Sequence, residues 1–181
     1  MSTANQSIQI QLKRMEKKKQ TLMNLIQELS EQSYSLQHNE YTWSVGQVAN
    51  HLYLSERLSL AYLKKKLTYP DTIPAFSIKS LWSLFFVNFT LWSPVKVKAP
   101  VMINMWEKQE VLSPDDLQQR WTEVRRELEA IIMENQPRFS SHLVYNHPFA
   151  GRMTMKQMLI FINHHMAHHL RQARRIIRKI N

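Results

Sequence analysis

Apolar side chains recur every three or four residues along four long stretches of the chain, which is the spacing of helices that bury one face. Between these stretches the sequence is polar or interrupted by proline. The abundance of Met, Leu, Gln, Lys, Arg and Glu also favours helices. The pattern predicts four long helices, at residues 7–36, 45–67, 114–135 and 155–180.

Three of the predicted helices start at residues that cap a helix N-terminus. Ser44 and Gln47 have the spacing of a capping box, in which each side chain accepts a hydrogen bond from the other residue's backbone. Thr154 and Gln157 repeat this spacing before the last helix. The third helix starts after Ser113, followed by a proline in the first helical position and by two aspartates that complement the helix dipole.

Residues 68–112 form a long connection that several prolines interrupt. Within it, the run Leu81 to Trp92 predicts a short helix, and "KVKAP" (residues 96–100) predicts extended chain. The first connection is short, so helices one and two should be antiparallel neighbours. The sequence thus predicts an all-α fold in a single domain, residues 1–181. This fold is a four-helix bundle with a long crossover between helices two and three, containing a short extra helix.

Composition excludes several classes of protein. The chain has two glycines, which rules out a glycine-rich phosphate loop, and no cysteine, which rules out disulfides and cysteine-based zinc sites. Its N-terminus lacks the pattern of a secretory signal. The most apolar run, Leu81 to Trp92, is shorter than the roughly 20 residues that span a bilayer. We therefore expect a cytoplasmic protein with no membrane partner.

The formal net charge of +10 is compatible with nucleic acid or an anionic surface as a partner. The basic residues gather at 13–19 and 171–179. They are not interleaved with exposed aromatic residues, and the chain has no nucleic-acid-binding motif. We interpret them as solvated helix faces and do not expect a nucleic acid partner. A binding protein without turnover, for DNA or for a small ligand, stays open as an alternative.

Four histidines lie within six residues of the last predicted helix, in "NHHMAHHLRQ". The apolar stripe of this helix passes through His165 and His169, so we expect their side chains to face the core. His164 and His168 fall on a neighbouring row with Phe161, Arg171 and Arg175, which we expect to face solvent. Residues four apart on a helix have Cβ atoms about 5–6 Å apart, close enough for two imidazoles to bind one ion.

Two imidazoles need a third ligand, and the best candidate is His51. It lies at the edge of the apolar stripe of the second predicted helix, three residues after Val48. Three histidines from two helices would leave coordination positions open, as in catalytic sites, whereas structural sites are usually closed by four protein ligands. The alternative is that these histidines are core residues without a metal.

The order of three motifs resembles the DinB-like superfamily. The motifs are "YTWSVGQVANHLYLSE", "HPFAGRMTMKQML" and "HHMAHHLRQARRI". In that superfamily a Trp-Ser start precedes a helix with one histidine, and the last helix carries His-x3-His-x2-Gln. The resemblance implies a four-helix bundle that often holds a divalent metal. It assigns the metal ligands to His51, His165 and His169, places Gln172 behind them as a supporting residue, and makes Trp43 a packing residue.

Characterised members of the superfamily include bacillithiol S-transferases and the mycothiol-dependent maleylpyruvate isomerase. The resemblance therefore implies a metal-dependent enzyme of the thiol S-transferase or isomerase type, with a low-molecular-weight thiol as cosubstrate. Three imidazoles suit zinc, nickel or iron. The alternative enzymatic hypothesis is a metal-dependent hydrolase. The sequence identifies neither the small-molecule substrate nor a catalytic residue. The apolar run at 81–92 suggests a homodimer.

Overall fold

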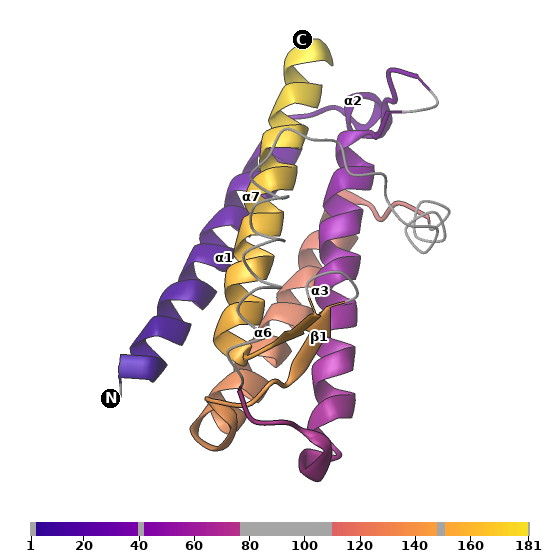
Figure 1. Cartoon of the computed structure of the whole chain (residues 1–181). Coiled ribbons are helices and arrows are strands. Elements are labelled where there is room, and N and C mark those ends of the chain that lie inside the picture. The colour runs from indigo at the N-terminus through magenta and orange to yellow at the C-terminus, as the bar shows by residue number, and fades with distance from the viewer. Residues whose placement is uncertain (1–2, 40–41, 77–109, 148–150, 181) are drawn as a thin grey trace.

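The computed structural model of the chain describes residues 3–39, 42–76, 110–147 and 151–180 (Figure 1). The expected short helix at 81–92 and the extended chain at 96–100 lie outside the described residues. The same holds for the run on which a homodimer was expected.

The described chain is mainly helical, as predicted. Its elements in chain order are α1 (Thr3–Gln27), α2 (Glu31–Ser35), α3 (Val45–Leu67), η1 (Pro70–Thr72), α6 (Pro114–Phe139), β1 (Tyr145–His147), β2 (Gly151–Met153) and α7 (Met155–Ile180). The capping box before α3 forms, because Gln47 N donates to Ser44 Oγ over 3.1 Å and Ser44 N donates to Gln47 Oε1 over 2.9 Å. The bounds of α3 and α7 confirm the prediction.

Three predicted helix limits were wrong. The first helix begins at Thr3 rather than residue 7. The first helix stops at Gln27 rather than residue 36, because Ser30 caps a separate short helix and accepts a hydrogen bond from Ser33 N over 3.2 Å. The third helix continues four residues beyond 135, to Phe139, with Pro137 inside its last turn. Because proline has no backbone N–H, Pro137 leaves the one carbonyl four residues earlier without its helical donor.

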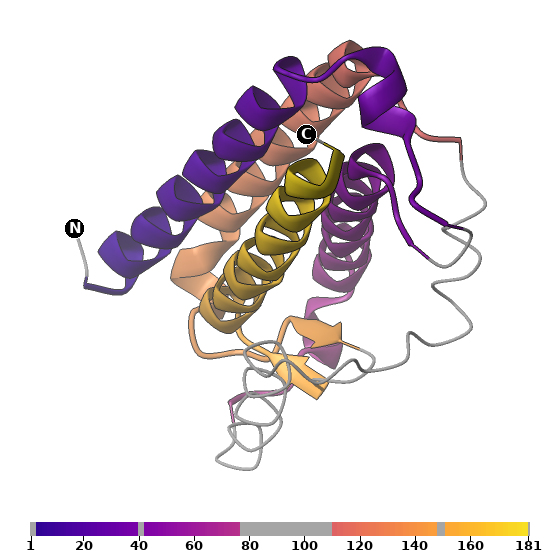
Figure 2. The ribbon, with the colours of Figure 1, turned by 90° about the horizontal axis from the view of Figure 1, so that it is seen from above.

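The four long helices form a bundle in which α1 and α7 run in one direction and α3 and α6 in the other (Figure 1). Each helix packs mainly on two neighbours, in the order α1, α7, α3, α6 around the bundle. Helices α1 and α3 are therefore antiparallel but lie diagonally, on opposite sides of α7 (Figure 2). The expectation that they would be neighbours was wrong, because α1 ends early and residues 28–44 are long enough to cross the end of the bundle.

The bundle centre contains a charged pair among apolar side chains. Arg125 on α6 donates to both carboxylate oxygens of Glu56 on α3, and its Nη2 lies 2.7 Å from Oε1. The same nitrogen lies 3.0 Å from the sulfur of Met166 on α7, and Nη1 lies 3.6 Å from Glu16 on α1. Arg125 thus contacts all three other long helices. Burying such charges is costly unless they are paired and hydrogen-bonded, as they are here.

A short β-hairpin precedes α7, which the sequence did not predict. β1 and β2 pair antiparallel, and Gly151 begins β2 with φ 67°, a conformation that side chains rarely adopt. The hydroxyls of Tyr145 and Ser59 lie 2.9 Å apart, which joins the hairpin to α3. No helix in the described part of the chain is long and apolar enough to cross a membrane.

Candidate metal centre

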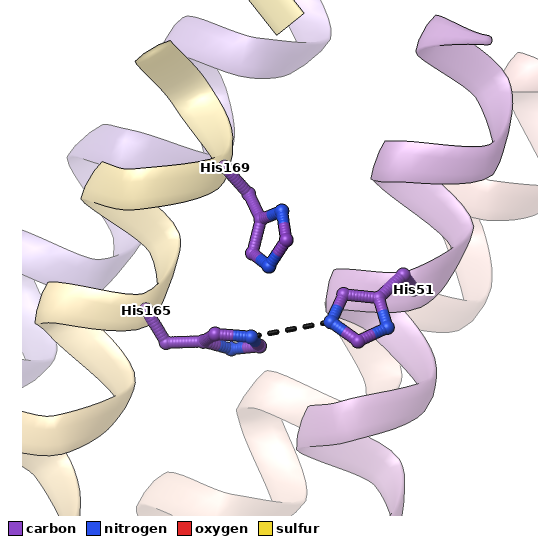
Figure 3. Close-up of side chains that lie close together, drawn as sticks. All are labelled: His51, His165 and His169. Carbon is purple, nitrogen blue, oxygen red and sulfur yellow. Dashed lines mark hydrogen bonds between the residues drawn. The ribbon is translucent and has the colours of Figure 1, made fainter. Parts of the chain in front are cut away.

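Three histidines from two helices converge between α3 and α7. His51 lies in the second turn of α3, and its position is fixed by the capped start of that helix. His165 and His169 lie one turn apart in the middle of α7. All three rings point toward a common centre (Figure 3). The structure therefore brings together the three residues that the sequence selected.

The nitrogens of the three rings are close enough to share one ion. One ligand nitrogen from each ring lies within 4.8 Å of the other two. Nε2 of His51 and Nε2 of His165 are 3.2 Å apart. Two nitrogens at about 2.0–2.1 Å from a tetrahedral zinc ion lie roughly 3.3 Å apart, so this pair already has the required separation. Among the described residues, this is the group of at least three His, Asp or Glu side chains that fits an ion.

A neighbouring glutamine fixes the proton on His169. Nδ1 of His169 lies 2.8 Å from Oε1 of Gln172, one helical turn further along α7. Because an amide oxygen only accepts, Nδ1 carries the proton and Nε2 keeps its lone pair. Metal-binding histidines are commonly oriented by such a bond from the other ring nitrogen. Gln172 therefore lies where a supporting residue was predicted.

All three imidazoles are held in the neutral form, which a metal ligand requires. Burial, and after it the charge of His168, lowers the pKa of His51, 9% exposed, to about 4. Burial and then the charge of His51 lower the pKa of His169 to about 3, against the bond from Gln172. Burial also lowers the pKa of His165 well below its usual value. Protons therefore do not compete with a metal near neutral pH.

Aromatic rings surround the histidines. The ring of Trp43 lies parallel to that of His169, with an interplanar angle of 11° and centroids 6.1 Å apart. It also lies 5.1 Å from the ring of His51. Phe161 lies parallel to His165, at 9° and 5.9 Å. Trp43, which was expected to be a packing residue, packs against two of the three histidine rings.

One row of α7, which we call the outer row, was expected to face solvent, and this exposure was predicted correctly for only some of its residues. His164, Arg171 and Arg175 are exposed as expected, but His168 is half-buried and its ring centroid lies 5.0 Å from that of His169. Phe161 was placed on the solvent-facing row, and this was wrong, because it is 6% exposed.

The hairpin explains the burial of Phe161. The ring of His147 on β1 lies 4.4 Å from that of Phe161, and burial lowers the pKa of His147 to about 4. Neither Phe161 nor His147 was among the predicted site residues. The four-residue spacing between Phe161 and His165 was the available signal for the first. For the second, the available signal was its place at the start of the motif "HPFAGRMTMKQML", because the hairpin was not predicted.

The comparisons with known proteins bear on this arrangement. A model of the DinB superfamily matches residues 14–173, a range that includes all three histidines and Gln172. The chain belongs to the DinB superfamily. No curated protein and no solved structure matches it. Membership in the DinB superfamily and the histidine cluster together fit a metal-binding protein.

In this DinB superfamily member, the helices that carry the histidines supply almost no negative charge. α7 contains no aspartate or glutamate, and α3 contains only Glu56, which is paired with Arg125. A divalent ion held by three neutral imidazoles keeps its full charge. Such a centre favours an anion as its next ligand.

Proposed function

We propose that this chain is a metal-dependent enzyme of the thiol S-transferase or isomerase type. His51, His165 and His169 hold one divalent ion, which is zinc, nickel or iron, and a low-molecular-weight thiol is the cosubstrate. The observation that carries the proposal is the set of three neutral imidazoles without a carboxylate. This set leaves coordination positions and an uncompensated positive charge for an anionic ligand.

The ion, when bound, supplies Lewis acidity that stabilises the anionic form of a thiol. The chain itself has no cysteine, so the nucleophilic sulfur has to come from a cosubstrate. Gln172 keeps the proton of His169 on Nδ1 and so directs Nε2 toward the centre. Trp43 and Phe161 place apolar surface beside the ligand rings. Thiol chemistry also agrees with the characterised superfamily members.

Metal analysis of the tag-free protein beside His165→Ala is the first test. We expect near-stoichiometric zinc, nickel or iron in the wild-type chain and little in the variant. Little metal in both, even after incubation with zinc and nickel, would show that the three histidines are core residues.

A thiol-transfer assay then tests the chemistry. Wild type and His165→Ala are incubated with chlorodinitrobenzene and with bacillithiol, mycothiol, glutathione or cysteine in turn. The thiol loses its proton, the carbon–sulfur bond forms and chloride leaves. We expect conjugation faster than in the variant for at least one thiol. Hydrolysis of a nitrophenyl ester without any thiol would favour the hydrolase instead, because that reaction uses water at the same centre.

We further propose that the substrate is a small molecule and not a nucleic acid. Arg171 and Arg174, two exposed basic residues of α7, lie by helical geometry on the side of the helix away from His165 and His169. Binding to duplex and single-stranded DNA is measured against salt concentration. Tight binding near physiological salt with a steep salt dependence would contradict this assignment.

A further inference from the structure

Each ligand imidazole on α7 lies parallel to one aromatic side chain. His169 lies parallel to Trp43 within 11°, and His165 lies parallel to Phe161 within 9°. The two imidazoles are themselves nearly perpendicular, at 89°. The centre therefore contains two stacked pairs at right angles, each made of one metal-ligand candidate and one aromatic ring.

His165 needs an orienting contact outside the set of candidate ligands. The hydrogen bond described for it joins its Nε2 to Nε2 of His51, which is itself a candidate ligand. An ion between the two nitrogens takes the place of that bond. The ring torsion of a histidine is broad and roughly two-fold, so helix geometry alone does not fix the ring plane. The stacking contact with Phe161 uses the face of the His165 ring and not Nε2, so it does not depend on the bond to His51.

Trp43 is anchored to both helices of the site. It directly precedes Ser44, whose capping box fixes the start of α3, and His51 follows on that helix. Its ring contacts His51 from α3 and stacks on His169 from α7. The bond from Gln172 holds His169 at one edge of its ring, and Trp43 covers one face of the same ring.

We propose that Trp43 and Phe161, which we call the aromatic clamp, are positioning residues that hold the planes of His169 and His165 in the metal-binding orientation. This inference rests on the proposed metal centre. The clamp acts through the imidazoles and does not touch the ion. If Trp43 and Phe161 only filled space, a leucine of similar hydrophobicity would serve the centre equally well. If they set ring planes, a flat side chain is required.

Titration of the metal-free protein with Co²⁺, followed by its visible absorption and by competition with Zn²⁺, tests the clamp. We expect Trp43→Leu and Phe161→Leu to weaken metal binding by about 10- to 100-fold, as removal of supporting residues commonly does. The Co²⁺ spectrum should also change, because the ligand geometry is altered. Trp43→Phe keeps a flat ring and should stay within about 3-fold of wild type.

Tyr62→Leu is the matched control, since Tyr62 is an aromatic residue of α3 whose described ring contact is with Tyr145 and not with a candidate ligand. Circular dichroism and thermal melting of the metal-free variants report on folding. If Trp43→Leu does not fold, Phe161→Leu provides the same test from α7. If Trp43→Leu and Phe161→Leu lower the melting temperature but leave the Co²⁺ affinity and spectrum unchanged, the aromatic clamp is wrong and the proposed metal centre is unaffected. A wild-type protein that binds no metal would overturn the proposed function, and the clamp with it.

Discussion

Gln172 accepts a hydrogen bond of 2.8 Å from Nδ1 of His169, one turn earlier on the same helix. Because the donor and the acceptor both belong to α7, this helix alone determines which nitrogen of His169 carries the proton. The tautomer of His169 is therefore set within its own helix, whereas its ring also packs against Trp43 from outside α7.

Replacing Gln172 by leucine should weaken metal binding by about 10- to 100-fold. Leucine removes the acceptor, so Nδ1 and Nε2 of His169 then compete for the single proton of the neutral ring. Gln172→Glu keeps an acceptor and should bind metal at least as well as wild type near neutral pH. Chelator competition with Zn²⁺ measures both variants. Wild-type affinity in Gln172→Leu would show that the bond contributes nothing to the centre.

The two histidine pairs of α7 should differ in metal retention. His165→Ala and His169→Ala each remove an imidazole that faces His51, so both should abolish retention of a stoichiometric ion. His164→Ala and His168→Ala should leave it mostly intact, since these residues lie on the outer row. Elemental analysis after gel filtration measures all four variants. Loss of metal in the outer pair and retention in the inner pair would reverse the assignment.

The helix register was sufficient to predict the inward histidines, because the apolar stripe of α7 has an unambiguous period and α3 begins at a capping box. The diagonal placement of α1 and α3 was not predictable in the same way. It depends on the end of α1 at Gln27, where the apolar pattern continues to Leu29 and does not mark the break at Ser30.

The apolar pattern also could not predict contacts between elements that are distant in the sequence. Phe161 appeared to belong to a polar row, and only the hairpin strand that carries His147 explains its burial. The pairing of Glu56 with Arg125 joins residues 69 positions apart, and helical periodicity gives no information on which charges meet.

Removing one partner of the buried pair should destabilise the fold strongly. Glu56 is 1% exposed, so Arg125→Met leaves its carboxylate buried without the guanidinium. We expect a loss of about 3–5 kcal/mol in the free energy of unfolding, measured by urea denaturation. The double variant Glu56→Leu with Arg125→Met should be less destabilised than Arg125→Met, because no charge of the pair remains buried.

The pair of Lys64 and Glu127 is the control for this experiment. It also joins α3 and α6, but both side chains are about half exposed. Lys64→Met should therefore change the free energy of unfolding by less than about 1 kcal/mol. Equal losses in Lys64→Met and Arg125→Met would show that burial does not set the cost of breaking an ion pair here.

The metal-free protein should lose stability as the pH falls below about 6.5, the usual pKa of a histidine in an unfolded chain. In the folded protein the pKa of His51 is lowered to about 4 and that of His169 to about 3. Between these values and 6.5 the unfolded chain binds more protons than the folded chain, so acid favours unfolding. The contribution of each histidine is fully present above 6.5 and is lost on the way down to its folded-state pKa.

Urea denaturation at several pH values between about 7.5 and 5 measures this dependence, with a slope of up to about 1.4 kcal/mol per pH unit for each histidine. His51→Asn should show a smaller slope than wild type, because one of the groups that take up a proton on unfolding is gone. His38→Ala should keep the wild-type slope, since His38 is exposed. A free energy of unfolding that stays constant over this range would mean that the folded and unfolded chains bind the same number of protons, so that the buried histidines have ordinary pKa values. The lowered pKa values, and with them the argument that protons do not compete with a metal, would then be wrong.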